Sequence, residues 1–404
     1  MKKPELLAPA GSVETAETAL RYGADALYCG GPMLQLRAET AGLNEQDLSH
    51  IIGLAHEQRK RLYVAVNSFA YDEDFEKLVP YTAKLYDMGA DAVIVSDIGA
   101  IAAIRRNVPE LEIHLSTQAN CMNSEAARVY YNMGVQRIVL ARELSVEHIK
   151  KIRKNTPQEL ELEAFVHGAM CMAYSGRCLI SSYLTGRRAN TGDCTQSCRW
   201  TYHLTEEKRP GEYFPVCEDE NGTTILSSKE LCSISFLDRL EQAGVSCFKV
   251  EGRMRTPYSI GIVINAYRMA LDGKASTADL QRELDTISHR PYGSGFYLGD
   301  ADSTDSDADG LLQNWRFVAQ AVSDSKNGIV NVRIRNRIEI GDILEVISPG
   351  QTGKPFPVQS IEEDGEECDI ANVPMRTVCI SCPYPVCAGD FFRRSNKASD
   401  SLSQ

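Results

Sequence analysis

The chain has 404 residues, 43% of them hydrophobic and 24% charged, which is enough to bury a sizeable core in roughly two or three domains. Its net charge of −12 argues against a protein that binds nucleic acid over its whole surface. The opening MKKPELLAPAGS lacks the apolar run of a signal peptide, and no stretch reaches the about 18 uninterrupted apolar residues of a membrane-spanning helix. We therefore expect a cytoplasmic protein with no membrane partner, in which the 13 cysteines stay reduced.

The first part of the chain repeats one pattern, in which a short apolar run is followed by a turn residue and a helical segment. The apolar runs are predicted strands, at Leu6–Ala8, Ala26–Cys29, Leu62–Val66, Ala92–Val95, Ile113–Leu115, Ile138–Ala141 and Leu160–Val166, with an eighth from Cys247. Segments between them, such as VETAETALRYGA and SEAARVYYNMGV, are predicted helices that end in a glycine suited to a C-cap. Strands that alternate with helices predict a parallel sheet, and eight repeats predict a (β/α)8 TIM-like barrel. A doubly wound open sheet is the alternative.

Strand alternation predicts which side chains point toward the barrel axis. The polar side chains that we single out on this inner face are Glu163, His167, Glu251, Arg253 and Gln118. Barrel enzymes place their sites at the carboxyl ends of the strands, and a charged interior is costly unless its charges are paired or bind a ligand. As a set, these residues therefore predict a catalytic site. For each one taken alone, a structural hydrogen bond or ion pair is the competing interpretation.

A long segment, residues 168–246, interrupts the pattern between the seventh and eighth strands and leaves the seventh strand at the catalytic end. The cysteines that we single out in it are Cys171, Cys178, Cys194, Cys198 and Cys232. In a chain without an export signal, they are better explained as metal ligands than as disulfides. The spacings of the first four do not match a two-residue zinc knuckle, which favours an iron–sulfur cluster. Burial as small hydrophobic side chains is the alternative.

Within this segment, the stretch between Cys171 and Trp200 concentrates positive charge although the whole chain is acidic. Arg187, Arg188 and Arg199 lie in it, and Trp200 follows directly. Arginines among aromatic side chains suit phosphate contacts and base stacking. We expect these residues to contact RNA, and a solvated, positively charged loop is the alternative.

The composition changes toward the C-terminus, where RFVAQAV, GIVNVRI and DILEVI are short strand-like runs separated by Gly and Asp turns. They predict a small β-barrel domain at residues 311–395, followed by a disordered tail at residues 396–404. Residues 1–310 would then form the catalytic barrel domain. Cys379, Cys382 and Cys387 lie in the small domain, but three ligands in a strand-like context make a second metal site a weak prediction.

The run EAFVHGAMCMAYSGRCLISSY closely resembles the signature of peptidase family U32, the collagenase-like proteins. The similarity continues through LLAPAGSVETAETALRYGADALYCGG, HLSTQANCMNSEAARVYYNMGVQRIVLARELS, TGRRANTGDCTQSCRW, FKVEGRMRTPYSIGIVINAYR and HRPYGSGFYLG, over roughly residues 4–300. Within the family, the chain is most similar to the prephenate-dependent tRNA uridine 5-hydroxylation proteins. The resemblance implies oxygen-independent hydroxylation of the wobble uridine in the tRNA anticodon loop, with prephenate as co-substrate.

The resemblance also implies a 4Fe-4S cluster on Cys171, Cys178, Cys194 and Cys232, with Cys198 as an alternative ligand. On this hypothesis, His167 or Glu251 would act as general base. Arg253 would bind a prephenate carboxylate through two hydrogen bonds. Arg187, Arg188 and Arg199 would hold phosphates, and Trp200 or Tyr183 would stack on the base.

Other functions stay open at this point. Relatives hydroxylate a ribosomal RNA cytidine or a small aromatic substrate in ubiquinone synthesis, and some act as heteromers with a protein of the same family. The family label implies a collagenase-like peptidase. However, the sequence has no H-E-x-x-H zinc helix and no G-x-S-x-G nucleophile turn.

Overall fold

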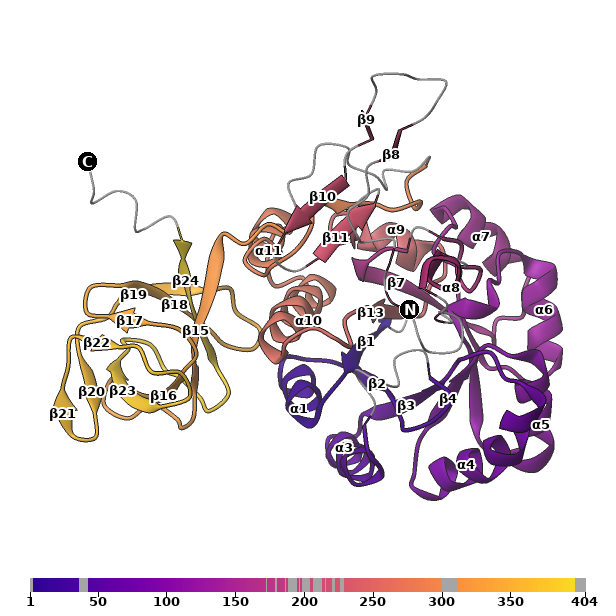
Figure 1. Cartoon of the computed structure of the whole chain (residues 1–404), viewed down its shortest axis with the longest axis horizontal. Helices are drawn as coiled ribbons and strands as arrows, with labels where there is room; N and C mark the ends of the chain where they lie inside the picture. The colour runs from indigo at the N-terminus through magenta and orange to yellow at the C-terminus, as the bar shows by residue number, and fades with distance from the viewer. Residues whose placement is uncertain are drawn as a thin grey trace. The chain divides into compact units, whose positions relative to one another are not determined.

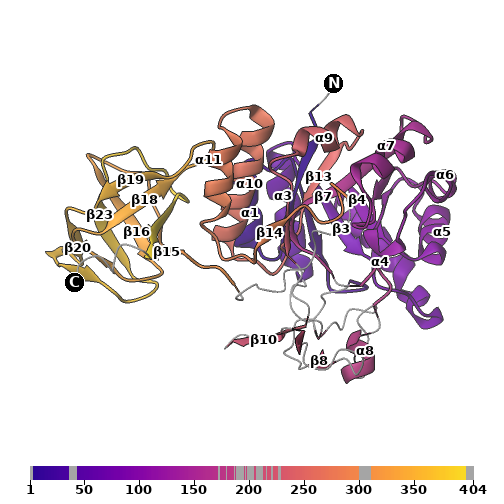
Figure 2. The same cartoon turned by 90° about the horizontal axis from the view of Figure 1, so that it is seen from above.

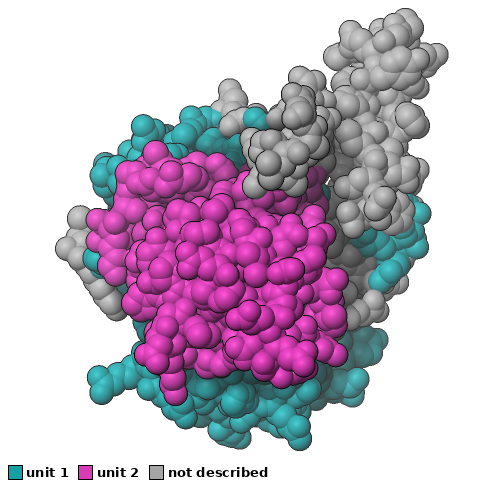
Figure 3. All heavy atoms as spheres, turned by 90° about the vertical axis from the view of Figure 1, so that its left-hand side faces the viewer, with its two compact units in different colours: residues 1–20, 24–255, 290–310 teal, residues 21–23, 256–289, 311–404 magenta. Residues whose placement is uncertain are grey.

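The computed structural model of the chain describes residues 3–35, 43–171, 173–178, 180–185, 187, 195, 197, 204–205, 213–214, 216–219, 222–225, 229–299 and 311–396 (Figure 1). The chain divides into two compact units, which are coloured separately in Figure 3. Unit 1 comprises residues 1–20, 24–255 and 290–310, and unit 2 comprises residues 21–23, 256–289 and 311–404.

Unit 1 contains a closed barrel of eight parallel strands. The strands are β1 (Glu5–Ala10), β2 (Ala26–Gly30), β3 (Arg61–Val66), β4 (Ala92–Val95), β5 (Glu112–Leu115), β6 (Arg137–Val139), β7 (Glu161–Ala169) and β13 (Cys247–Val250). Each strand pairs with the next in this order, and β13 pairs with both β7 and β1, which closes the barrel. The predicted (β/α)8 fold and all eight predicted strand positions are confirmed, and the open sheet is excluded.

Helices connect the barrel strands and lie outside them in Figures 1 and 2. They are α1 (Val13–Arg21), α3 (Glu45–Glu57), α4 (Phe75–Asp87), α5 (Ile98–Asn107), α6 (Ser124–Asn132), α7 (Val146–Lys154) and α9 (Leu237–Gln242). The first turns of α3, α5, α6 and α7 are stabilised by side-chain caps, as where the Asp97 carboxylate accepts a hydrogen bond from the Ala100 N–H at 2.8 Å. Gly89, Gly134 and Gly244 follow helices with φ between 90° and 92°, as expected for glycine C-caps.

The predicted insertion between the seventh and eighth strands is also present. It begins where β7 ends and includes α8 (Ile180–Thr185), β8 (Leu204–Thr205), β9 (Tyr213–Phe214), β10 (Val216–Asp219), β11 (Gly222–Ile225) and β12 (Glu230–Cys232). In Figure 2, α8 lies on the side of the barrel opposite the N-terminus. The returning strand β12 pairs antiparallel with β7 and parallel with β14 (Tyr292–Gly293). The insertion is therefore anchored to the strand from which it departs.

Unit 2 is built on an antiparallel sheet of eight strands. In spatial order, they are β19 (Lys354–Pro357), β18 (Ile343–Ile347), β24 (Phe391–Ser395), β15 (Trp315–Ala321), β16 (Ile329–Ile334), β23 (Thr377–Ser381), β20 (Ile361–Glu363) and β21 (Glu366–Glu367). A separate pair joins β17 (Ile338–Glu339) to β22 (Ile370–Ala371). Buried side chains such as Val318, Val332, Leu344 and Phe392 form its core. The predicted small C-terminal β-domain is thus confirmed as a fold.

Unit 2 also includes α10 (Pro257–Asp272) and α11 (Thr277–Leu284), which follow the eighth barrel strand in the chain. The buried Arg393 of β24 donates a hydrogen bond to Glu283 of α11 at 2.9 Å. Tyr258 of α10 stacks on Phe317 of β15, with ring centroids 4.6 Å apart. These contacts group the two helices with the sheet, and the domain boundary predicted at residue 310 stays a prediction.

Two further expectations concern the ends and the hydrophobicity of the chain. In the described part of the chain, no helix has both the length and the apolar character needed to cross a bilayer. Apart from Asn396, the predicted tail of residues 396–404 lies outside the described residues.

Candidate functional site

Glu163, in the middle of β7, is fully buried and paired with two cations inside the barrel. Lys249 Nζ donates a hydrogen bond to Glu163 Oε1 at 2.7 Å, and Arg137 Nη1 lies 3.3 Å from Glu163 Oε2. Burial alone would raise the pKa of this carboxyl, but the charges of Lys249, Arg137 and His114 lower it to about 2. The predicted inward orientation is confirmed. Such complete pairing favours the structural interpretation of Glu163.

Further ion pairs lie at the amino-terminal ends of the strands. Arg137, the first residue of β6, contacts Glu5 at 2.7 Å and Glu161 at 2.6 Å. The Tyr63 hydroxyl donates to the Glu5 carboxylate at 3.0 Å. His114 is buried, and its Nε2 lies 2.9 Å from a carboxylate oxygen of Glu112. This end of the barrel is therefore closed by paired charges, and a ligand would have to bind at the other end.

A second polar group lies at the carboxyl ends of the strands. We call it the mouth site and define it as Tyr28, Gln35, Arg142, Glu251 and Arg253. The Tyr28 hydroxyl donates to the Val250 carbonyl at 3.0 Å and to Glu251 Oε2 at 3.2 Å, and Arg142 Nη2 lies 3.8 Å from the same carboxylate oxygen. Arg253 Nη1 donates to Gln35 Oε1 at 2.6 Å. Two predicted residues, Glu251 and Arg253, thus lie in one constellation.

The electrostatics of Tyr28 reflect all the charges of the mouth site. Burial raises the pKa of Tyr28 well above its ordinary value, and the Glu251 carboxylate raises it further. Arg253 and Arg142 act in the opposite direction. The phenol therefore stays protonated at neutral pH and is available as a hydrogen-bond donor.

Arg142 was missed by the sequence analysis, because it lies just beyond the predicted sixth strand. Its guanidinium carbon lies 3.9 Å from the centroid of the Phe165 ring, and its Nη1 donates to the Ala169 carbonyl at 2.7 Å. Its Nε is buried and has no hydrogen-bond partner within the described part of the chain. Arg142 therefore retains an unused donor at the mouth site.

Gly30 makes room for the guanidinium group of Arg253. A Cβ atom on Gly30 would lie 2.0 Å from Gln35 Oε1 and 2.5 Å from Arg253 Nη1. Such distances are not tolerated between non-bonded atoms, so only glycine lets these two side chains cross the end of β2. Arg253 is 7% exposed, and its backbone carbonyl lies 1.9 Å from the position of a Cβ on Gly11. The placement of Arg253 thus depends on two glycines at the ends of neighbouring strands.

His167 and Gln118 occupy separate positions near the mouth site. His167 is 3% exposed, its ring centroid lies 5.4 Å from that of Tyr292, and it is paired in register with Cys232 of β12. Gln118 follows β5 in the short 3-10 helix η2 (Thr117–Ala119), and its carbonyl faces Gly176 of the insertion. For both residues a catalytic role stays a prediction.

Three of the five predicted metal ligands lie in the described part of the chain. Cys171 is exposed, Cys178 is partly buried and Cys232 is buried, and none of the three forms a disulfide among the described residues. Cys194 and Cys198 lie outside the described residues. Within the described ranges, no three Cys, His, Asp or Glu side chains come together as a metal-binding group. Cys171 follows β7, and Cys232 lies opposite His167 in the strand paired with β7. A thiolate-ligated cluster on these residues stays a prediction.

The predicted RNA-contacting residues are only partly visible. Arg187 is exposed just after α8. Arg188, Arg199 and Trp200 lie outside the described residues. Contact between this region and RNA therefore stays a prediction.

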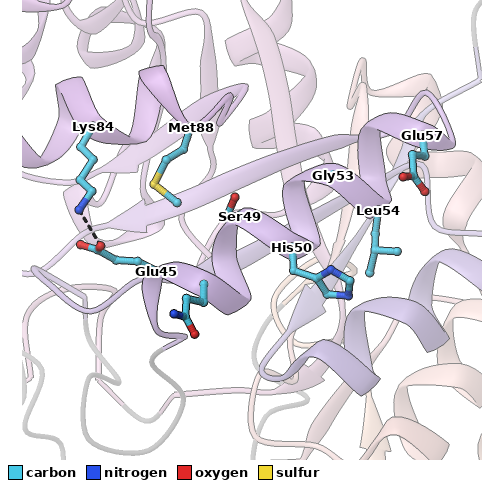
Figure 4. A pocket seen from close by; sticks show the side chains of 9 residues that line it. Glu45, Ser49, His50, Gly53, Leu54, Glu57, Lys84 and Met88 are labelled. Atoms are coloured by element: carbon cyan, nitrogen blue, oxygen red, sulfur yellow. Dashed lines mark hydrogen bonds and ion pairs between the residues drawn. The ribbon is translucent and has the colours of Figure 1, made fainter.

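A groove of about 680 Å³ lies elsewhere, between α3 and α4 (Figure 4). It is lined mainly by exposed polar side chains of α3, among them Ser49 and His50, and the Lys84–Glu45 ion pair of 2.6 Å crosses it. None of the predicted site residues lines it. The groove therefore adds nothing to the mouth site.

Comparison with known proteins gives a consistent result over the whole chain. The family model described as "Peptidase family U32" matches residues 11–307, and that described as "Peptidase family U32 C-terminal domain" matches residues 313–393. The chain is 35% identical over 430 residues to "tRNA hydroxylation protein P" of Escherichia coli (strain K12), which covers 95% of this chain and 94% of the relative.

Two other relatives have different names. The chain is 35% identical over 274 residues to "23S rRNA 5-hydroxycytidine C2501 synthase" of Escherichia coli (strain K12), covering 66% of this chain and 39% of that protein. It is 30% identical over 380 residues to "Collagenase" of Porphyromonas gingivalis (strain ATCC BAA-308 / W83), covering 89% of each.

Proposed function

The chain belongs to peptidase family U32, and from this membership and the mouth site we propose that it is a tRNA-modifying enzyme that hydroxylates a base. The observation that carries the proposal is the similarity to a tRNA hydroxylation protein over 95% of this chain. That match is long enough to include the strands that supply the mouth site. A second relative is named for hydroxylation of a ribosomal RNA base, which makes RNA the substrate class that the two names share.

The finer proposal is 5-hydroxylation of the wobble uridine, in a prephenate-dependent and oxygen-independent reaction. A base in the single-stranded anticodon loop can be presented out of its stack at low cost. Arg187, Arg188 and Arg199 would hold its phosphates, and Trp200 would stack on a base. The alternatives are another RNA base or a small aromatic molecule as substrate, and a heteromer with a protein of the same family.

Accessibility favours Glu251 over Glu163 as the proton-accepting group. The Glu251 side chain is 18% exposed, whereas that of Glu163 is 0% exposed and already paired with Lys249 and Arg137. Tyr28 donates a hydrogen bond to Glu251 Oε2 at 3.2 Å and thereby restrains the carboxylate. His167, which is less exposed, is the second candidate base.

The mouth site contains two guanidinium groups, those of Arg142 and Arg253. A guanidinium can hold a carboxylate through two parallel hydrogen bonds, which prephenate could accept. Arg253 is positioned by Gln35 for this role, and Arg142 supplies a buried Nε that lacks a partner in the described part of the chain.

A 4Fe-4S cluster on Cys171, Cys178, Cys194 and Cys232, with Cys198 as the alternative ligand, would supply electron transfer when bound. The structure contributes two facts to this part of the proposal. The described thiols form no disulfide with one another, and Cys232 is paired in register with His167 at the carboxyl half of β7. A cluster held there would lie beside a strand that also carries mouth-site contacts.

The proposal is tested by nucleoside mass spectrometry of bulk tRNA and ribosomal RNA from a strain that lacks this gene. We expect 5-hydroxyuridine derivatives to disappear from tRNA and to return when this gene alone is restored. Loss of a ribosomal hydroxycytidine instead would move the substrate to rRNA. Unchanged nucleosides, together with gelatin cleavage by the purified protein, would favour the collagenase-like alternative.

A further inference from the structure

The segment between two of the predicted metal ligands contains a tight turn. We define the cysteine loop as residues 171–178. Within it, the Arg177 N–H donates to the Tyr174 carbonyl at 2.9 Å, and Gly176 has φ of 72°. A glycine with positive φ as the third residue of a hydrogen-bonded four-residue turn is typical of a type II turn. The turn fixes the direction in which the chain reaches Cys178.

Glu143, in the loop after β6, binds this turn with both carboxylate oxygens. The Ser175 N–H donates to Glu143 Oε1 at 2.8 Å, and the Ser175 hydroxyl lies 3.3 Å from each carboxylate oxygen. Ser175 is 7% exposed, so water competes little for these hydrogen bonds. A carboxylate acceptor makes stronger hydrogen bonds than a neutral one. The loop is thus held by a charged group from another part of the barrel.

The other contacts of the turn are equally close. A Cβ atom on Gly176 would lie 2.0 Å from the Gln118 carbonyl oxygen, so the turn packs against the backbone of η2 with no space for a side chain. Thr117 Oγ1 lies 3.5 Å from Ser175 Oγ and donates to the Leu140 carbonyl at 3.1 Å. The cysteine loop therefore rests on the segments that follow β5 and β6.

The residue before Glu143 holds the start of the same loop. Arg142 Nη1 donates to the carbonyl of Ala169, two residues before Cys171, at 2.7 Å. Glu143 binds Ser175, three residues before Cys178. Two consecutive residues after β6 thus fix the chain ahead of each cysteine.

We propose that Arg142 and Glu143 are positioning residues that hold Cys171 and Cys178 in their metal-binding arrangement before any metal is bound. The inference rests on the proposed function only for the identity of the metal group, the iron–sulfur cluster. Ligands that are already ordered bind a metal more tightly than ligands in a mobile loop, and supporting residues of this kind typically change metal affinity by about 10–100-fold. Glu143 acts through the loop and touches neither substrate nor metal.

The first test uses metal-free, reduced protein and needs no cluster. Glu143→Ala removes the acceptor for Ser175, and Glu147→Ala is the matched control, because Glu147 is an exposed carboxylate paired only with Lys150 in the described structure. We expect hydrogen exchange of the peptide containing residues 173–178, and tryptic cleavage after Arg177, to be at least ~10-fold faster in Glu143→Ala than in the control. Equal rates in the two variants would overturn the proposal.

The second test measures the metal. After anaerobic reconstitution with iron and sulfide, we expect a chelator to remove iron about 10-fold faster from Glu143→Ala than from wild type. Glu143→Gln, which keeps an acceptor oxygen, should fall between the two and also serves if Glu143→Ala fails to fold. Iron release at the wild-type rate from both variants would overturn the positioning role. If wild type itself holds no iron, the cluster part of the proposed function fails, and the exchange experiment still decides whether Glu143 holds the loop.

Discussion

Replacing Glu163 with Gln separates the charge of this residue from its shape. The side chain is fully buried, and its carboxylate lies 2.7 Å from Lys249 Nζ and 3.3 Å from the Arg137 guanidinium. Arg137 would keep Glu5 and Glu161 as partners. Lys249, whose side chain is 5% exposed, would lose its carboxylate partner. The main effect of Glu163→Gln is therefore an unbalanced ammonium group inside the barrel.

Two arguments give the expected loss of folding stability in Glu163→Gln. Breaking a buried ion pair by removing one partner costs about 3–5 kcal/mol. Independently, the pKa of Glu163 is lowered from 4.5 to about 2, and a shift of this size corresponds to about 3 kcal/mol of stability. Because the pKa is lowered in the folded state, this stability is present above the ordinary pKa and is lost as the pH falls through about 2. The two estimates agree.

Urea unfolding followed by circular dichroism at several pH values measures this effect. Wild type and variant share unit 2, so the difference between their free energies of unfolding reports the barrel. We expect the difference to be about 3 kcal/mol at pH 7 and to shrink toward zero as the pH falls from about 4.5 to about 2. Glu161→Gln is the matched control, because Glu161 contacts the same arginine but is 43% exposed, and we expect it to cost less than about 1 kcal/mol.

Two results would refute this reasoning. Equal losses in Glu163→Gln and Glu161→Gln would mean that burial does not strengthen the pair. A difference that stays constant between pH 7 and pH 2.5 would mean that the ionised form of Glu163 is not what stabilises the barrel.

Two further predictions concern the insertion. Protein purified without oxygen should be brown and contain about four irons per chain, and Cys171→Ser should lose both the colour and the iron measured by elemental analysis; one bound zinc and no iron in wild type would contradict this. Changing Arg187 and Arg188 together to Glu should weaken tRNA binding and flatten its salt dependence, measured by filter binding at several salt concentrations, while the iron content stays unchanged; an unchanged salt slope would place the RNA elsewhere.

Much of the fold could be predicted because it is encoded locally. The barrel strands are short apolar runs set off by turns and helical segments, and glycines such as Gly89 and Gly134 end helices with positive φ. Strand alternation was sufficient to place Glu163 on the inner face. These features depend on neighbours in sequence, and a single sequence therefore contains them.

The remaining parts of the site depend on contacts between distant segments. Arg253 binds Gln35, 218 residues away in the chain, and no local pattern connects them. Tyr28 lies in the apolar run ALYCG, and this local pattern does not predict that its hydroxyl contacts other mouth-site residues. Arg137 begins a strand of only three residues, which is too short to show an alternation.

Two other features could not be predicted from local sequence, namely the last strand of the insertion and the grouping of the last helices with the C-terminal sheet. The three-residue strand β12 becomes a strand by pairing with β7 and β14, which lie far from it in the sequence. The helices α10 and α11 are joined to the C-terminal sheet by contacts such as that between Arg393 and Glu283, 110 residues apart. Such contacts between distant segments form only when the chain folds, so no local sequence pattern predicts them.

The central claim, that the mouth site hydroxylates tRNA, is tested most directly in a strain that lacks this gene and carries either the wild-type gene or Arg253→Lys. Lysine cannot make the two parallel hydrogen bonds of a guanidinium. Nucleoside mass spectrometry of tRNA should show 5-hydroxyuridine derivatives restored by wild type and absent with Arg253→Lys, while the variant accumulates to the wild-type level with a similar melting temperature. Full restoration by Arg253→Lys, or tRNA that is equally hydroxylated with and without the gene, would contradict the claim.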